Sequence, residues 1–272
     1  MINHIETVTF SPTGHTKRLA ETMGRILSKQ LDVPLTCTDF TLPKDQGVEH
    51  YYGPHTLVIF AMPTYAGRIP NKALPFVQTM FRADEAPTVA IVSYGNRSYD
   101  SSLTELRDEL AKKKFIVFAA GAFAMPHAFA DIGIEHPTAE DWTVFDRLVQ
   151  GVLDTLVQDK PLQQVVINGD APVAPYYIPM GEDGQPAKFL KAKPKTYSSR
   201  CDHCGLCAKV CPMGSISFDN TDEVPGICIK CQACVRYCPN DAKYFDDPRF
   251  LSHKAMLEKN YQRLAKSEIF LP

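Results

Sequence analysis

CDHCGLCAKVCP at residues 201–212 and CIKCQACVRYCP at residues 228–239 are two copies of one cysteine spacing, C-x2-C-x2-C-x3-C-P. With two residues between successive thiolates, three sulfurs surround one iron–sulfur cluster, while the fourth cysteine, which precedes proline, ligates the other cluster of a pair. Two copies therefore predict two 4Fe–4S clusters with crossed ligands. We expect one cluster on Cys201, Cys204, Cys207 and Cys238, and the other on Cys211, Cys228, Cys231 and Cys234.

Zinc and disulfide bonds are the alternatives for these cysteines. Two C-x2-C pairs can bind tetrahedral zinc, but each stretch supplies three closely spaced cysteines before its Cys-Pro step, which favours iron–sulfur clusters. A disulfide framework belongs to oxidising compartments, and the first residues show no secretory signal. The ninth cysteine, Cys37, ends a predicted apolar strand, where a lone cysteine usually packs as a small hydrophobe.

The composition is ordinary for a globular protein, with 44% hydrophobic and 22% charged residues. The length of 272 residues corresponds to two domains as a prior. No apolar run approaches the roughly 18 residues that span a bilayer, so we expect a cytoplasmic protein without a membrane span. The formal charge is −2, and two oxidised clusters would bring it to about −6, which argues against binding to nucleic acid.

The first 160 residues alternate between apolar β-type runs and amphipathic helical stretches. This alternation predicts an α/β fold with a doubly wound, five-stranded parallel sheet and right-handed connections. Ligands of such sheets bind beyond the carboxyl ends of the strands. Strands are expected at residues 5–10, 33–38, 57–62, 89–93 and 115–123, and helices near residues 17–27, 71–82, 103–113 and 145–157.

Three loops should meet at that ligand end. SPTGHT at residues 11–16 links a strand to a helix, a geometry in which backbone amides, the helix dipole and hydroxyl groups bind an anion. A simple N-capped helix is an equally weighted alternative for this loop, and the lack of a following lysine excludes a nucleotide-hydrolysing P-loop. PTYAGRIP at residues 63–70 and SYGNRSYD at residues 93–100 combine glycine, which allows close approach to a ligand, with tyrosine, which can cover an aromatic ring.

Residues 1 to about 160 resemble flavodoxin, because SPTGHT matches its phosphate loop, S/T-x-T-G-x-T. Together with the cysteine stretches, the chain resembles the flavodoxin–ferredoxin fusion proteins of anaerobic microbes. The resemblance implies FMN, a flavodoxin-like sheet of order 2-1-3-4-5, and a small α+β dicluster ferredoxin-like domain. The FMN phosphate would lie on Ser11, Thr13, Gly14, His15 and Thr16. The isoalloxazine would lie between loops that contain Pro63, Thr64, Tyr65, Ala66, Gly67, Ser93, Tyr94, Gly95, Asn96 and Tyr99.

The chain departs from flavodoxin at the ring. Many flavodoxins stack a tryptophan on the flavin, whereas the sole Trp here, Trp142, lies in the region of the last predicted helix of this domain and is interpreted as core. Tyr65 and Tyr99 are then the available stacking residues. His15 replaces a frequent asparagine of the phosphate loop. His127 could approach the flavin edge, although a solvated loop histidine is favoured.

Four segments are predicted: a flavodoxin-like domain at 1–165, a Pro-rich linker at 166–197, a dicluster domain at 198–245, and a helical tail at 246–272 that packs back on one of the domains. Prolines and glycines make the linker extended and semi-rigid. Its lysines are interpreted as solvated in preference to a docking patch: Lys188, Lys191, Lys193 and Lys195.

We expect an electron-transfer protein that passes single electrons between the two clusters and FMN. The alternative is an enzyme, a ferredoxin-coupled FMN-dependent reductase of a small molecule, for which no catalytic residue can be named. A redox sensor is disfavoured, because no regulatory or DNA-binding region is visible. The expected partners are low-potential redox proteins that donate or accept electrons, and pairing of two chains in a homodimer stays open.

Overall fold

The structure is a computed structural model that describes residues 1–158 and 160–272. Its main sheet has the order β10-β7-β6-β4-β1-β2. The five strands from β2 to β7 run parallel, and β10 is antiparallel to β7. Counted along the chain, the parallel strands have the flavodoxin-like order 2-1-3-4-5. The strands are β1 (His4–Thr9), β2 (Leu35–Asp39), β4 (Thr56–Pro63), β6 (Ala86–Tyr94), β7 (Phe115–Ala124) and β10 (Glu268–Phe270).

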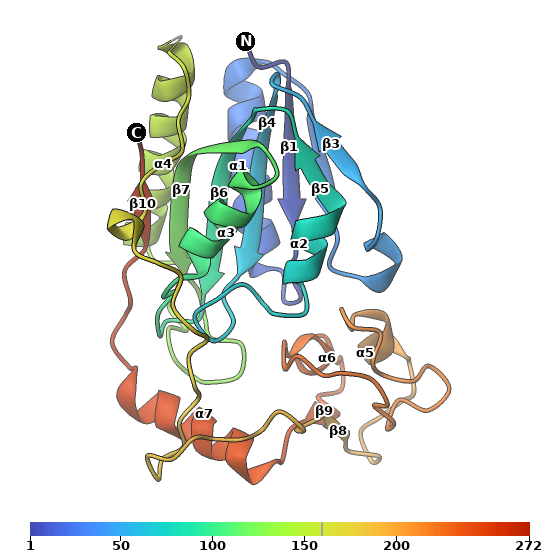
Figure 1. The fold of residues 1–272 in the computed structure, drawn as a ribbon. Helices are drawn as coiled ribbons and strands as arrows, with labels where there is room; N and C mark the ends of the chain where they lie inside the picture. The colour runs from blue at the N-terminus through green and yellow to red at the C-terminus, as the bar shows by residue number, and fades with distance from the viewer. Residues whose placement is uncertain (159) are drawn as a thin grey trace.

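Helices cover both faces of this sheet (Figure 1). One apolar layer packs under α1 and α4, and the other packs under α2 and α3. The central strands β4 and β6 are buried almost throughout, as parallel strands covered on both faces should be. A small pair, β3 (His50–Tyr52) and β5 (Phe81–Ala83), lies beside the sheet. The helices are α1 (His15–Leu31), α2 (Leu74–Met80), α3 (Ser102–Ala111) and α4 (Ala139–Val157).

The C-terminal tail is only partly helical, which corrects the prediction for residues 246–272. Helix α7 (Pro248–Asn260) is capped by Asp247, whose carboxylate accepts from the amides of Arg249 and Phe250. The chain then returns to the first domain and pairs as β10 with the edge of β7. An exposed sheet edge offers unpaired backbone groups that a short extended segment can satisfy. Three residues are too few for a strand signal to stand out from the helical pattern before them.

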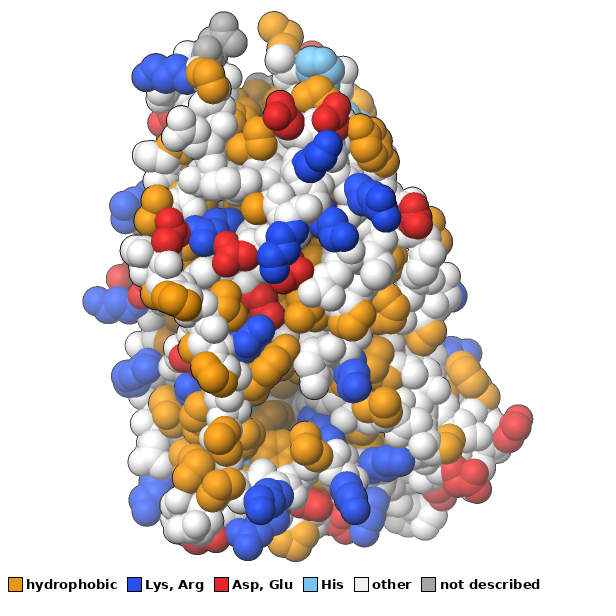
Figure 2. Space-filling model, viewed as in Figure 1, with side chains coloured by type: hydrophobic (Ala, Val, Ile, Leu, Met, Phe, Trp, Pro, Cys, Tyr) orange, Lys and Arg blue, Asp and Glu red, His pale blue; other side chains and the backbone are white. Residues whose placement is uncertain are grey.

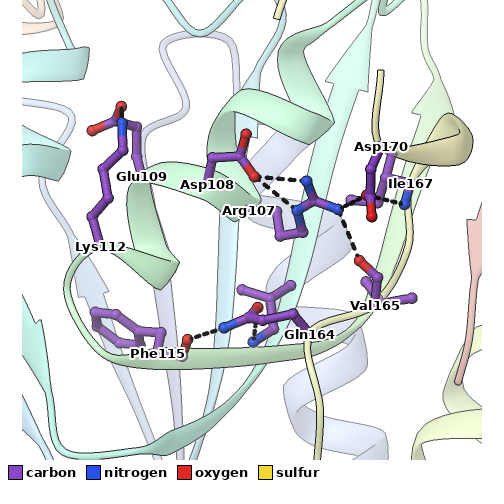
Figure 3. Close-up of polar contacts among 10 residues, drawn as sticks. Arg107, Asp108, Glu109, Lys112, Phe115, Gln164, Val165, Ile167 and Asp170 are labelled. Atoms are coloured by element: carbon purple, nitrogen blue, oxygen red, sulfur yellow. Dashed lines mark hydrogen bonds and ion pairs between the residues drawn. The ribbon is translucent and has the colours of Figure 1, made fainter. Parts of the chain in front are cut away.

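The chain around the start of the linker, from Gln164 to Asp170, is fixed to the first domain (Figure 3). The Gln164 side chain accepts from the Val117 amide at 2.9 Å and donates to the Phe115 carbonyl at 2.6 Å. Arg107 donates to the Val165 carbonyl at 3.0 Å, and it also pairs with Asp108 and Asp170. The chain from residue 164 therefore leaves along the edge of β7 in one defined direction.

Residues 174–180, here called the strap, lie across the loops at the carboxyl ends of the strands. Arg68 donates to the Ala174 carbonyl at 2.8 Å, and the Tyr177 amide donates to the Ala66 carbonyl at 2.8 Å. The Tyr176 hydroxyl donates to the Ile69 carbonyl at 2.8 Å. The strap is therefore packed on the protein, where a solvated segment was expected. The yellow segment of Figure 1 follows this path down to α7.

The dicluster part is a small unit built on the two cysteine stretches. Its ends are joined by the antiparallel pair β8 (Lys195–Thr196) and β9 (Lys243–Tyr244). Each stretch forms one short helix, α5 (Leu206–Lys209) or α6 (Ala233–Arg236). In Figure 1 the arrowheads of β1, β4, β6 and β7 point toward this unit and α7. The dicluster unit therefore faces the ligand end of the sheet.

Candidate flavin and iron–sulfur sites

The first loop has the geometry of an anion site. Gly14 adopts a left-handed backbone (φ 85°) directly before α1, and the first turn of a helix leaves amides without intrahelical partners. The Thr16 hydroxyl shares a hydrogen bond of 2.7 Å with Ser93, which ties this loop to the third one. Ser11 Oγ accepts from the Lys17 amide at 3.0 Å. Free amides and hydroxyls, without a carboxylate in the loop, fit the phosphate of FMN.

The second loop is a tight turn that is stabilised by its own backbone hydrogen bonds and by an ion pair with α3. Tyr65 and Arg68 exchange both backbone hydrogen bonds, at 2.8 and 3.1 Å. A Cβ at Gly67 (φ 75°) would lie 2.2 Å from Asp100, so only glycine fits there. The Arg68 guanidinium binds the buried Glu105 carboxylate at 2.8 and 2.5 Å. This buried pair fixes the turn that presents Tyr65.

Tyr65 lies beside the second group of cysteines. Burial raises the pKa of its phenol well above the usual value, and the neighbouring Cys231 and Cys228 raise that pKa further. The phenol therefore stays neutral. Of the two tyrosines proposed to cover a flavin ring, this one is at the junction between the second loop and the dicluster unit.

The third loop directs its large side chains inward, toward the C-terminal tail. The Tyr94 hydroxyl donates to the Lys266 carbonyl at 2.6 Å, and the Tyr99 hydroxyl donates to Glu268. The fully buried Asn96 accepts from the Ala265 amide at 2.8 Å. This geometry favours Tyr65 over Tyr99 as the residue that could cover a flavin. Sequence reasoning missed the role of these residues, because their partners lie more than 160 positions away.

His127 is part of the protein framework, whereas the sequence favoured a solvated loop histidine. Its Nδ1 accepts from the amides of Phe129 and Ala130 at 3.3 and 3.1 Å, so the ring proton is on Nε2. Burial, together with nearby cations, lowers the pKa of His127 to about 3. A Cβ at Gly95 would lie 2.5 Å from the imidazole. The neutral ring therefore covers the backbone of the third loop.

The eight cysteines surround two cavities. The partition is the one expected from the spacing, with the fourth cysteine of each stretch in the cavity of the other. The first cavity is lined by Cys201, Cys204, Cys207 and Cys238, and the second by Cys211, Cys228, Cys231 and Cys234. In residues 1–158 and 160–272, no three His, Cys, Asp or Glu side chains are close enough to hold a single metal ion. Four cysteines around each cavity match the donor set of a 4Fe–4S cluster.

The two stretches wrap their cavities with the same backbone pattern. Left-handed conformations occur at His203 and Gly205 in the first stretch, and at the equivalent Lys230 and Gln232 in the second. Such turns direct successive amides toward one point, where they can stabilise anionic sulfur. Backbone amides donate to cysteine sulfurs from Ser215 to Cys211 (3.3 Å), from Lys230 to Cys228 (3.4 Å) and from Ala242 to Cys238 (3.2 Å).

The second cavity is on the side of the dicluster unit that contacts the first domain. Ile229 packs against the apolar core under α2 and α3. Gln46 donates to the Pro212 carbonyl at 3.2 Å. Figure 2 shows a hollow with hydrophobic side chains around it between the ends of the sheet strands and the C-terminal elements. The loops predicted to bind FMN and the second group of cysteines meet in this region.

Two other residues from the sequence analysis lie away from this region. Trp142 is half-buried on α4 and packs edge-on against Phe145 at 5.4 Å, in keeping with a core role. Cys37 is exposed on the edge strand β2. The prediction that Cys37 packs as a small hydrophobe is therefore wrong, because nothing in the described residues covers its side of the edge strand.

Residues 200–242 match the family described as the 4Fe-4S dicluster domain. This segment is a 4Fe–4S dicluster domain. The chain therefore joins a sheet of flavodoxin-like strand order to a dicluster ferredoxin domain. No helix in the described part of the chain is long and apolar enough to cross a bilayer.

Solved structures with weak similarity include two that align with 57% of this chain at 15% identity. One is rubredoxin oxygen:oxidoreductase from the anaerobe Desulfovibrio gigas, with a TM-score of 0.41; the alignment spans 36% of that protein. The other is a flavodoxin from the domain Archaea, with a TM-score of 0.38 over 99% of its length. None of the curated proteins matches the chain. The fold assignment therefore comes from the strand order of this chain.

Proposed function

We propose that the protein transfers single electrons between two 4Fe–4S clusters and an FMN bound at the ligand end of the sheet. The observation that carries the proposal is the position of the second cysteine cavity beside Tyr65 of the second loop. Clusters exchange one electron at a time, whereas a flavin accepts one or two. The protein supplies binding, burial and electrostatics.

The residues present fit both kinds of cofactor. The phosphate of FMN would be bound by the loop of residues 11–16, and its ring would lie near Tyr65, between the second and third loops. The cavity-lining cysteines would bind the clusters, and backbone amides that donate to their sulfurs would tune the reduction potentials.

The order of electron carriers follows from burial. Cys231 and Cys234 of the second cavity are each 8% exposed, whereas Cys204 of the first cavity is exposed. We infer that a low-potential partner protein exchanges electrons with the first cluster, which passes them through the second cluster to the flavin. In this order each transfer joins neighbouring cofactors, and burial increases stepwise from the first cluster at the surface toward the flavin.

Electron transfer is favoured over reduction of a small-molecule substrate. The strap and the dicluster unit both pack against the loops that would surround the flavin. These contacts occupy the approaches that a substrate would use. Electrons can still reach the flavin through the dicluster unit that packs against these loops.

Cofactor analysis of anaerobically purified protein tests the proposal. We expect about eight irons and one FMN per chain. Two zinc ions without iron would contradict the cluster assignment, and a chain that bound no flavin under any redox condition would contradict the role of the first domain.

A further inference from the structure

The phosphate loop needs a cation that its own helix does not supply. A phosphate monoester carries a charge of about −1.5 to −2 at neutral pH. Lys17, in the first turn of α1, is paired with Asp39 at 2.9 Å. Arg18 lies over the ring of Trp142 at 5.5 Å. Burial lowers the pKa of His15, with Arg236 and Arg18 as further causes, so this imidazole is neutral at physiological pH.

Two side chains at the end of α6 face this loop from the dicluster domain: Tyr237 lies against it, and the charge of Arg236 acts on its His15. The Tyr237 hydroxyl lies 3.2 Å from the position that a Cβ would take at Gly14. Tyr237 is 42% exposed. It therefore stands directly over the turn that would bind the phosphate, and its hydroxyl makes no hydrogen bond within residues 1–158 and 160–272.

Arg236 is held next to Tyr237 by the first domain. Its Nη2 donates to the His127 carbonyl at 2.6 Å, and its Nε donates to the Ala128 carbonyl at 3.1 Å. These bonds leave Nη1 for another acceptor. Because Arg236 acts on His15 electrostatically, its charge lies within range of the phosphate loop.

We propose that Arg236 and Tyr237 complete the FMN phosphate site from the dicluster domain, so that both parts of the chain bind the cofactor. The inference extends the proposed function, on which it rests. A guanidinium and a phenol would add charge-assisted hydrogen bonds to those of the backbone amides. FMN would then bind more tightly to the docked arrangement and would stabilise it.

Binding of two flavins distinguishes this role from a structural one. Riboflavin has the same ring system as FMN but lacks the phosphate. Arg236→Gln removes the charge while its amide can still donate to the carbonyls, and Tyr237→Phe removes only the hydroxyl. Dissociation constants are measured by flavin fluorescence on the full-length, cluster-loaded chain, with iron content checked for each variant.

We expect Arg236→Gln to weaken FMN binding by about tenfold or more and Tyr237→Phe to weaken it severalfold, because hydrogen bonds to charged groups are the stronger kind. Riboflavin binding should not change. Arg200→Ala, which alters an exposed arginine of the same domain that bonds to the Asp241 carbonyl, is the control and should bind FMN normally.

Unchanged FMN binding in Arg236→Gln would overturn the inference. Equal weakening of FMN and riboflavin would also overturn it, since Arg236 would then only hold the two parts together. Wild-type protein that bound neither flavin would overturn the proposed function as well, so the two failures can be told apart.

Discussion

The eight cysteines proposed to bind clusters differ from the ninth in their structural surroundings as clearly as in their sequence spacing. Cys211 lines the second cavity although it belongs to the first stretch, and its sulfur accepts from the Ser215 amide. Cys37 is exposed on an edge strand far along the chain from both stretches. Because cysteines of both stretches line each cavity, a cluster in either cavity would depend on both stretches.

Cys211→Ser should therefore damage the second cluster and leave Cys201, Cys204 and Cys207 on the first, because it removes one ligand of the second cavity. Of about eight irons, up to about four should be lost. Iron analysis and EPR of the reduced protein measure this outcome, with Cys37→Ser as the control that keeps both signals. Selective loss of the first cluster would show that the crossed assignment is wrong.

His127 makes stability depend on pH. Its folded pKa of about 3 lies below the ordinary value of 6.5, so the unfolded chain binds the proton more readily than the folded one. This stability is fully present above pH 6.5 and is lost progressively as the pH falls from 6.5 toward 3. The groups around the ring that oppose its protonation are His253, Arg236, Arg97 and Lys254.

Between pH 8 and pH 5.5, wild type should lose about 1.4 kcal/mol more unfolding free energy than His127→Gln, since pH 5.5 lies one unit below the unfolded pKa and one pKa unit corresponds to about 1.4 kcal/mol. Anaerobic denaturant titrations at several pH values measure the difference. His55→Gln, which changes an exposed histidine, is the control. Parallel pH dependence of wild type and His127→Gln would mean that His127 already takes up its proton in the folded state.

At the scale of elements, the sequence predicted what is locally encoded. The apolar runs of β4 and β6 and the strand–loop–helix pattern around Gly14 are local signals, and the cysteine partition follows from spacing. The strap and β10 were not predicted, because each depends on a few contacts between distant positions. The hydrogen bond from the Tyr177 amide to the Ala66 carbonyl is an example, since no periodicity in either segment predicts it.

Strand β10 connects the tail to the first domain, and its removal should destabilise that domain. Besides its pairing with β7, the preceding Ser267 accepts from the Ala124 amide at 3.1 Å and donates to the buried Asp141 at 2.6 Å. Deletion of residues 267–272 should lower the unfolding free energy by about 2–3 kcal/mol, since each net hydrogen bond contributes about 1 kcal/mol.

Denaturant unfolding followed by far-UV circular dichroism would measure this loss. Ile269→Thr is the matched control, because it changes a half-buried side chain of β10 and keeps the backbone pairing with Gly121. Equal stability of the deletion variant and wild type would mean that β10 adds nothing to the sheet.

At the scale of the whole molecule, the chain crosses between its two parts twice. The linker leaves along β7 and passes over the ligand end as the strap, the dicluster domain follows, and the tail returns through α7 to β10. Arg236 and Gln46 add direct contacts between the parts. These connections restrict the dicluster domain to positions near the flavin loops, whatever the protein concentration.

Electrons should therefore pass from the clusters to the flavin within one chain. We expect flavin reduction after rapid mixing with a one-electron donor to be first-order, with a rate constant that stays the same over at least a tenfold dilution of the protein, because the effective concentration is set by the chain itself. Anaerobic stopped-flow absorbance at flavin and cluster wavelengths measures it. Arg236→Gln, loaded with FMN at saturating concentration, should keep this independence of dilution, because the strap and β10 still hold the parts together. A rate that rose in proportion to chain concentration would mean that transfer occurs between molecules, as in a dimer that pairs the flavin of one chain with a cluster of another.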